Sequence, residues 1–416
     1  MEDRTAVPPK GPKPLQKQEA RLAWGMLLPT IVSIALIVVL PLLAIFWISF
    51  KPVSLGDLRA PSPIANERLR GELSAPGDRA TIEYRLRNSH AQNRITGVEL
   101  IDTIPEGLAI EELDDRCELA GQRLTCTLGD WEGGHRESLQ LPVTAEIEFP
   151  DGPPNPRDSA PVLSGEGQSA LTGWDLTLDN FIAVFDARDF LSVLWATVFY
   201  TVVGTIGALV AGLFAALLLN QTFRGRGVLR GLFLFPYVVP VIAAAFTWIT
   251  LFDPFSGSAN ALLLQMGFTQ GPINFFGERP LALIMVTVFE IWRYFPLSFL
   301  FILARMQAVD AGMFEAADMD GASPFQKFRY LLLPQLFGIL SVLFLLRFIW
   351  TFNKFDDIFL LTGGNAGTRT LTVNVYEQAF AVSDIGAGAA VAVVIFFCLL
   401  GFSAIYFWAL RHEEEL

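Results

Sequence analysis

The sequence predicts a mainly α-helical protein whose membrane domain has six transmembrane helices, with an all-β sandwich domain inserted after the first of them. Two observations predict the membrane domain. Of the 416 residues, 52% are hydrophobic and only 17% are charged, and the apolar residues gather in runs long enough to cross a bilayer, which takes about 20 residues. The β domain is predicted by one polar segment in which hydrophobic and polar residues alternate.

The first elements are expected to be a cytoplasmic tail, residues 1–20, and a transmembrane helix, residues 21–50. No charged residue lies between Arg21 and Lys51, and several Lys residues precede the run. A secretory signal peptide also begins with a basic stretch, but this run is too long for one and lacks a clean small-residue cleavage site. Since Lys and Arg favour the cytoplasmic side, the tail is expected inside.

Residues 51–173 are expected to form an extracytoplasmic β-sandwich with its linkers. This segment carries most of the chain's formal charge of −12. The alternation in residues 80–87 and 139–149 is typical of half-buried strands, and the run from Ile104 to Gly107 is a turn signal. The Pro- and Gly-rich residues 149–173 are predicted to be a linker back to the membrane.

Residues that can carry chemistry are few. Cys117 and Cys126 lie in the exported segment, where an oxidising exterior favours a disulfide between them. The motifs G-x-x-x-x-G-K-[S/T] and G-x-S-x-G are absent, and His90, His135 and His412 have no partners at metal-ligand spacing. We therefore expect no catalytic residues, no cofactor and no metal in this chain, so another chain would bind any ATP that drives it.

Residues 174–410 are expected to contain five further transmembrane helices. Their approximate bounds are 190–220, 231–252, 281–304, 331–352 and 386–410. The turn around Arg224 and the connection from Arg305 to Arg329 both contain Lys or Arg residues, so both are expected on the cytoplasmic side. Six spans satisfy this arrangement and leave residues 411–416 as a cytoplasmic tail, with both termini inside.

The connection between the fourth and fifth spans predicts a helical hairpin at the cytoplasmic face. Glu315 to Asp320 can form a short helix that Gly321 ends, and Ser323-Pro324 can start a second helix with Ser as its cap. Phe314, Phe325 and Phe328 would be available for packing.

This hairpin resembles the E-A-A-x-x-x-G loop of the permease subunits of binding-protein-dependent ATP-binding-cassette (ABC) importers. The assigned loop residues are Glu315, Ala316, Ala317, Asp320, Gly321, Ala322, Phe325 and Pro334. In that family the loop is the coupling helix that docks in a cleft of the ATPase. The resemblance implies that Glu315 pairs with a basic residue there and that Gly321 permits a tight fit.

The resemblance covers about residues 174–410. Leu176 to Phe181 and Phe235 to Pro240 are similar to family segments, and residues 350–380 resemble the outer loop of the sugar and glycerol-phosphate, maltose-type branch. It implies the type I ABC importer fold, a bacterial inner-membrane location and a sugar or related solute. It also implies partners: a second homologous permease, a dimer of ATPases holding ATP and Mg, an extracytoplasmic solute-binding protein and membrane lipid, with no nucleic acid.

Residues of the fourth span and the outer loop are candidates for the solute path. Glu290 and Arg293 lie three apart, so they either neutralise one another or face a water-filled cavity, whereas Arg347 is expected to snorkel toward the interface. Aromatic rings can stack on sugars or simply pack. The candidates are Glu290, Trp292, Arg293, Phe295, Asn353 and Asp356, and Pro236, Pro240 and Pro296 are expected to interrupt their helices.

Two other functions stay open. Residues 75–150 resemble the immunoglobulin-like repeat of bacterial surface proteins, notably in Tyr84 to Asn88 and Val98 to Leu108, which suits a membrane-anchored adhesion or sensor protein. An ion-driven carrier would need inverted repeats and buried carboxylates, of which Glu290 is the main candidate. Neither explains the hairpin. The insert departs from the maltose-type permease, because it follows the first span directly.

Overall fold

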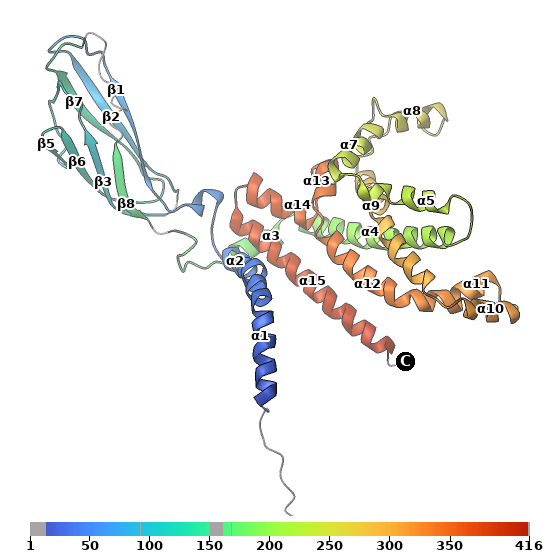
Figure 1. Cartoon of the computed structure of the whole chain (residues 1–416). Coiled ribbons are helices and arrows are strands. Elements are labelled where there is room, and N and C mark those ends of the chain that lie inside the picture. The colour runs from blue at the N-terminus through green and yellow to red at the C-terminus, as the bar shows by residue number, and fades with distance from the viewer. Residues whose placement is uncertain (1–13, 92, 150–160, 168, 415–416) are drawn as a thin grey trace, which may run out of the picture.

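The computed structural model describes residues 14–91, 93–149, 161–167 and 169–414, and combines membrane helices with a β-sandwich that stands beside them (Figure 1). Parts of the predicted tails and of the predicted linker at 149–173 lie outside the described residues. The mainly α-helical fold class with an inserted β domain is confirmed.

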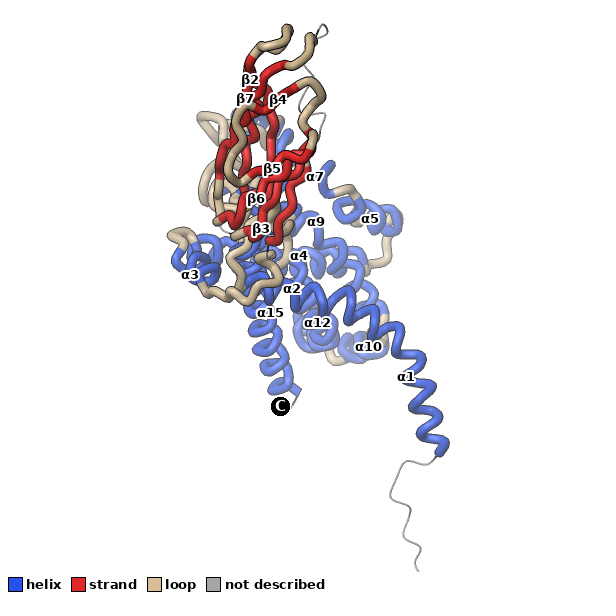
Figure 2. Tube along the Cα trace, turned by 90° about the vertical axis from the view of Figure 1, so that its left-hand side faces the viewer, coloured by secondary structure: helices blue, strands red, loops and turns tan. Residues whose placement is uncertain are grey.

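Helices make up most of the chain on either side of the sandwich. They are α1 (Pro14–Ile34), α2 (Leu40–Ser49), α3 (Asp179–Asp186), α4 (Phe190–Leu219), α5 (Arg226–Phe233), α6 (Phe235–Val238), α7 (Val241–Leu251), α8 (Ser258–Gln265), α9 (Leu281–Gln307), α10 (Ala311–Met319), α11 (Pro324–Gln326), α12 (Leu333–Phe352), α13 (Asp356–Thr362), α14 (Leu371–Tyr376) and α15 (Ile385–Glu414). A π-helical turn, Ala35–Val39, joins α1 to α2. The first span stands away from the other helices along α1 (Figures 1 and 2).

Five stretches in the described part of the chain are long and apolar enough to cross a membrane. They are Arg21–Ser49, Phe190–Leu219, Leu281–Gln307, Pro324–Phe352 and Ile385–Arg411. Each coincides with a predicted apolar run. The predicted span at 231–252 is different, because it is divided into two helices.

The division of that span falls at Pro240. Arg226–Val238 and Val241–Leu251 meet at an angle of 91°, and the two residues between them are extended, with ψ values of 136° and 134°. Proline lacks the N–H that would bond four residues back and disfavours a helical residue before it. Counted as one broken span, the pair brings the total to six. Pro296 lies inside the uninterrupted α9, so the interruption predicted there is wrong.

Helices α4 and α9 pack closely because α4 presents small residues along one face. Ala196, Gly204, Ala208, Gly212 and Ala216 are all buried. A Cβ at Gly212 would lie 2.6 Å from the Cβ of Ser298 on α9, so the helices could not approach this closely with a side chain there. Small residues favour helix association in membranes, where van der Waals packing is a main attraction.

The inserted domain is a sandwich of two four-stranded antiparallel sheets, ordered β1-β2-β7-β4 and β5-β6-β3-β8. The strands are β1 (Pro63–Arg70), β2 (Arg79–Asn88), β3 (Ile95–Thr103), β4 (Leu108–Ile110), β5 (Cys117–Ala120), β6 (Arg123–Trp131), β7 (Arg136–Ala145) and β8 (Val162–Gly167). Strands β2 and β7 confirm the two predicted from alternation, and the predicted turn is present, where Gly107 has a φ of 86°.

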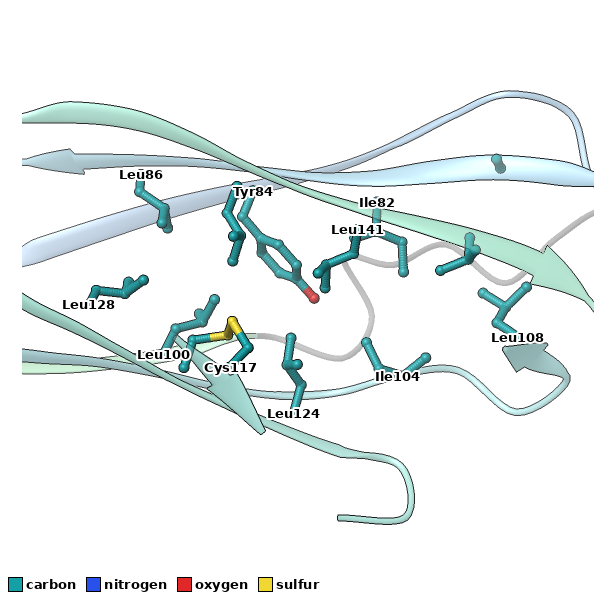
Figure 3. Close-up of a cluster of buried hydrophobic side chains, with 14 of the residues drawn as sticks. Ile82, Tyr84, Leu86, Leu100, Ile104, Leu108, Cys117, Leu124, Leu128 and Leu141 are labelled. Carbon is teal, nitrogen blue, oxygen red and sulfur yellow. A yellow bond between two sulfur atoms is a disulfide. The ribbon is translucent and has the colours of Figure 1, made fainter. Parts of the chain in front are cut away.

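Alternate side chains of the strands meet between the two sheets and form the core of the sandwich (Figure 3). Tyr84 lies in this core, and its hydroxyl donates a hydrogen bond to Asp102 at 2.5 Å. Burial and this hydrogen bond raise the pKa of Tyr84. Cys117 and Cys126 face one another across β5 and β6 and are joined by a disulfide. The sandwich thus has a closed core of its own.

The prediction that residues 149–173 form only a linker is wrong, because β8 lies within them and pairs with β3. Its sequence, Val-Leu-Ser-Gly-Glu-Gly, contains too few β-branched or aromatic residues to signal a strand. The glycines are needed for close packing: a Cβ at Gly165 would lie 2.8 Å from a methyl carbon of Ile95, and one at Gly167 would lie 2.5 Å from the Pro61 carbonyl oxygen.

The base of the inserted domain is bound to the membrane helices. Asn180 of α3 donates from its side-chain amide to two backbone carbonyls at and just beyond the end of α2, at 2.9 and 2.8 Å. The Leu55 amide donates to the Ser383 carbonyl at 2.8 Å, and the Gly386 amide donates to the Val53 carbonyl at 3.0 Å. The sandwich therefore rises from a base made by α2, α3 and the start of α15 (Figure 1).

Candidate functional site

A cluster of buried charged and hydroxyl side chains lies among the membrane helices, centred on Glu290 of α9. Glu290 is fully buried, and Arg347 of α12 forms an ion pair with its Oε1. Thr351 of α12 donates a hydrogen bond to the same oxygen at 3.0 Å, and Tyr200 of α4 donates to Oε2 at 3.1 Å. One carboxylate thus joins three helices.

Helix geometry explains how these residues meet. Arg347 and Thr351 are four positions apart, so they lie on one face of α12. Tyr200 is followed four positions later by Gly204, where a Cβ would lie only 3.1 Å from the Cγ of Glu290. Buried charges are tolerated when they are paired and hydrogen-bonded. The expectation that Arg347 snorkels is wrong: only 1% of this residue is exposed, because it pairs with Glu290 inside the bundle.

The predicted pairing of Glu290 with Arg293 does not form. Arg293 instead donates hydrogen bonds to the carbonyls of Pro236 and Val239, at 3.3 and 2.9 Å. Pro240 has no N–H to offer the Pro236 carbonyl four residues back. The guanidinium of Arg293 therefore supplies donors that the broken span lacks, and it stabilises the break rather than the charge of Glu290.

Three cationic side chains lie over the aromatic ring of Tyr294, beside the cluster. The guanidinium of Arg347 lies 4.4 Å from the ring centroid, the Lys354 ammonium 4.7 Å and the Arg293 guanidinium 5.6 Å. Such contacts are favourable where the cation is partly desolvated. Asp356, one of the predicted path residues, accepts a hydrogen bond from Lys354 at 3.1 Å and is linked to the cluster in this way.

The other predicted path residues lie elsewhere. Trp292 packs against Trp248, with 5.4 Å between ring centroids, and Phe295 packs against Phe233 at 5.9 Å. Asn353 donates to a carbonyl one turn back at the end of α12. Sequence reasoning did not select Tyr200, Thr351 and Lys354. Their signal was available, because each is a polar residue in or beside a span that is otherwise apolar.

The predicted hairpin is present between α9 and α12 (Figure 1). Helix α10 starts at Ala311, earlier than predicted, because Asp310 caps it by accepting a hydrogen bond from a backbone amide at 2.9 Å. Gly321 follows α10 with a φ of 74°, a conformation that favours glycine. Ser323 caps α11 in a capping box with Gln326, as the sequence predicted for Ser323.

The hairpin packs against the membrane helices at its base, and its tip is exposed to solvent. Phe314 and Phe328 pack against the hydrophobic core formed by α4, α9 and α12. Phe325 is 72% exposed. Of the assigned loop residues, Glu315, Ala316, Asp320, Gly321, Phe325 and Pro334 are exposed, and Ala317 and Ala322 are half-buried. This arrangement presents an exposed surface that includes the carboxylates of Glu315 and Asp320 and the ring of Phe325.

Comparison with known proteins places the helical part in a family of transporters. Residues 208–412 match the model of the binding-protein-dependent transport system inner membrane component. The chain is 37% identical over 222 residues to the inner membrane ABC transporter permease protein YcjO of Escherichia coli (strain K12), covering 53% of this chain and 74% of that protein.

Two further relatives are permeases. The trehalose/maltose transport system permease protein MalF of Thermococcus litoralis is 34% identical over 239 residues, covering 57% of this chain and 80% of that protein. The sn-glycerol-3-phosphate transport system permease protein UgpA of Yersinia pestis is 32% identical over 234 residues, covering 55% and 78%.

A solved structure agrees in fold. It is the crystal structure of a bacterial ABC transporter involved in the import of the acidic polysaccharide alginate, with a TM-score of 0.53 and 17% identity, covering 59% of this chain and 86% of that chain. The family resemblance stated from the hairpin is confirmed, and a transport component is favoured over an adhesion or sensor protein. The chain belongs to the binding-protein-dependent transport system inner membrane component family, the permeases of ABC transporters.

Proposed function

We propose that this permease carries a sugar or related solute inward, such as an oligosaccharide, a glycoside or a glycerol-phosphate-like compound, driven by an ATPase on a separate chain. The observation that carries the proposal is the exposed hairpin between α9 and α12, whose helices are both capped. It is a preformed surface suited to a cleft in a partner. The trehalose/maltose and sn-glycerol-3-phosphate permeases among the relatives support the solute class.

The charge distribution supports an orientation with both termini in the cytoplasm. Arg224 lies just before α5, Arg226 and Arg230 lie within α5, and Arg305, Lys327 and Arg329 lie in or beside the hairpin. Basic residues favour the cytoplasmic side of the bacterial inner membrane. The sandwich and α13 lie toward the opposite end of the helices from the hairpin (Figure 1), which suits an extracytoplasmic position for both.

The proposal includes three kinds of partner. A second homologous permease would complete the solute path, a dimer of ATPases would bind ATP and Mg, and a solute-binding protein would deliver the solute from outside. Helices α9 and α12 both lead from the hairpin to the Glu290 cluster, so a displacement of the hairpin by closing ATPases would be carried to the Tyr294, Lys354 and Asp356 region. Glu290 itself is fully buried and would act by holding these helices together.

The docking role is tested by isolating the assembled complex. The whole chain is co-expressed with its ATPase and purified in mild detergent as wild type, as Glu315→Ala and as Gly321→Trp, which strains a residue at positive φ. Exposed Glu278, just before α9, gives the matched control Glu278→Ala. We expect the wild type and the control to retain the ATPase and both loop variants to lose most of it. Undiminished retention by both loop variants would contradict the docking role.

The solute class is tested with the complete importer. Vesicles containing the permease pair and the ATPase are supplied with the solute-binding protein, ATP and a panel of labelled disaccharides, oligosaccharides, glycosides and glycerol phosphates. We expect ATP-dependent uptake of at least one of them, with competition among related compounds. Absence of ATP-dependent uptake of every compound in this panel would overturn the sugar assignment.

A further inference from the structure

Asp357, in the first turn of α13, is a buried acid without an ordinary partner. It is 0% exposed, and within the described residues neither of its carboxyl oxygens has a hydrogen-bond partner. The Lys354 ammonium lies 3.9 Å from Oδ2 but donates to the neighbouring Asp356 at 3.1 Å. A buried carboxylate ion left in this state would be costly.

The groups around Asp357 provide an acceptor for a proton. Glu290 and Tyr294 of α9, Tyr200 of α4, and Lys354 and Asp356 along the chain all lie close enough to Asp357 to interact with its charge. Glu290 already accepts hydrogen bonds from Arg347, Thr351 and Tyr200, which is the bonding of an ionised carboxylate. An acid that keeps its proton can donate to that carboxylate, whereas an ionised one would repel it.

We propose that Asp357 is a neutral carboxylic acid that donates its proton to Glu290, and that it is the positioning residue that holds α13 against α9. Apolar contacts act in the same direction, because Ile358 and Leu361 of α13 lie in one buried cluster with Phe289 of α9. Burial raises the pKa of Asp357, and the negative charge of Glu290 raises it further. The bonded proton therefore persists at pH values where an exposed Asp is fully ionised.

Loss of the proton would change the contact between the helices. Ionised Asp357 would place a second negative charge beside Glu290, and the Lys354 ammonium, 3.9 Å from Oδ2, would offset only part of it. Helix α13 begins the connection between α12 and α15, so its release would displace that connection. Since the folded-state pKa is raised, the contact is strongest at low and neutral pH and weakens as the pH rises through the folded-state value.

The proton can be detected without a transport assay. Infrared difference spectra of the whole purified chain at neutral pH, wild type minus Asp357→Asn, are expected to show the carbonyl stretch of a protonated carboxylic acid. Exposed Asp186 at the end of α3 gives the matched control Asp186→Asn. This variant is expected to retain the protonated acid, so the band should be missing from the difference spectrum of wild type minus Asp186→Asn. Absence of the band from the Asp357→Asn difference spectrum, or its replacement by carboxylate bands, overturns the proposal.

The positioning role rests on the proposed transport function and is tested by the pH profile of solute uptake. Wild-type uptake is expected to fall at alkaline pH, approaching about tenfold per pH unit once the acid ionises. Asp357→Asn, whose amide can still donate to Glu290, is expected to remove this decline. Asp357→Leu cannot donate and is expected to lower uptake at every pH.

Each outcome decides one of the two proposals. Identical alkaline declines in wild type and Asp357→Asn would overturn the positioning role. Absence of ATP-dependent uptake by the wild-type complex at every pH would overturn the transport proposal, while the infrared band would still decide whether Asp357 carries a proton.

Discussion

At the residue scale, Glu290 shows what sequence spacing can and cannot predict. An acidic residue inside an apolar run signals a polar partner, and this signal was correct. Spacing pointed to Arg293 on the same helix, but the partner is Arg347, which lies 57 positions away on α12. Arg293 instead donates hydrogen bonds to two carbonyls at the helix break at Pro240. The sequence predicted that break but not that Arg293 lies beside it.

The first prediction concerns this ion pair. Arg347→Met should destabilise the chain by about 3–5 kcal/mol, because it leaves a buried carboxylate without its cation. Adding Glu290→Gln should recover most of the loss, since the remaining amide is neutral: its oxygen can accept from Thr351 and its NH2 group can donate to the Tyr200 hydroxyl. Denaturant unfolding of the purified chain in detergent measures both effects.

Arg188, exposed in the connection between α3 and α4, gives the control for this prediction. Arg188→Met removes the same side chain from a solvated position and should change stability by less than about 0.5 kcal/mol. A double variant as unstable as Arg347→Met alone would show that the loss comes from packing of the arginine stem and not from the unpaired charge.

At the element scale, the second prediction is that Arg293 stabilises the break between α6 and α7. Arg293→Met should leave the carbonyls of Pro236 and Val239 unsatisfied, at a cost of about 1–3 kcal/mol for each buried group. In a Pro240→Ala background the cost should be smaller, because the restored N–H can bond the Pro236 carbonyl. A double-mutant cycle on unfolding free energies measures this dependence. Strictly additive effects would contradict it.

The third prediction concerns the contact of α4 with α9. Gly212→Ala should destabilise the chain by about 1–3 kcal/mol, because the new Cβ would lie 2.6 Å from the Cβ of Ser298 and 2.8 Å from the amide nitrogen of Phe299. Gly338→Ala on α12 is the matched control, since nothing lies within 4 Å of a Cβ there. Thermal unfolding in detergent should show a loss only for Gly212→Ala; equal behaviour of the two variants would contradict the close approach.

Elements with strong local signals were predictable, and those that depend on distant contacts were not. Long apolar runs indicated the spans, and the sequence from Glu315 to Pro324 indicated the hairpin because Gly321 and the Ser323 cap act locally. Strand β8 was missed because its residues have low strand preference and are held by pairing with β3. The position of Asp357 against Glu290 likewise depends on how α13 folds back on α9.

At the scale of the whole molecule, the sequence indicated two parts but not how they are joined. The membrane helices and the sandwich have separate hydrophobic cores, as the change in residue pattern after Lys51 suggested. The junction is made by backbone hydrogen bonds between residues near 53–55 and 383–386. Backbone pairing over such a separation leaves no residue pattern, so only the fold shows that the sandwich has a fixed base.

The last prediction tests that base. A Cβ at Gly386, near the start of α15, would lie 2.3 Å from the Lys51 carbonyl oxygen and 2.7 Å from the side-chain amide nitrogen of Asn180. Gly386→Val should therefore separate the base of the sandwich from α15 and speed proteolytic cleavage within residues 51–58. The sandwich itself should stay folded and keep its Cys117–Cys126 disulfide, because its core is independent of the junction.

Gly401, farther along α15, provides the matched control for this experiment because nothing lies within 4 Å of a Cβ there. Gly401→Val should be cleaved at the wild-type rate. Uptake measured with the same two variants then separates two roles for the insert. Reduced uptake by Gly386→Val alone would mean that transport needs the sandwich held at this base. Unchanged uptake together with faster cleavage would mean that the helices work without that constraint, and unchanged cleavage would contradict the fixed base itself.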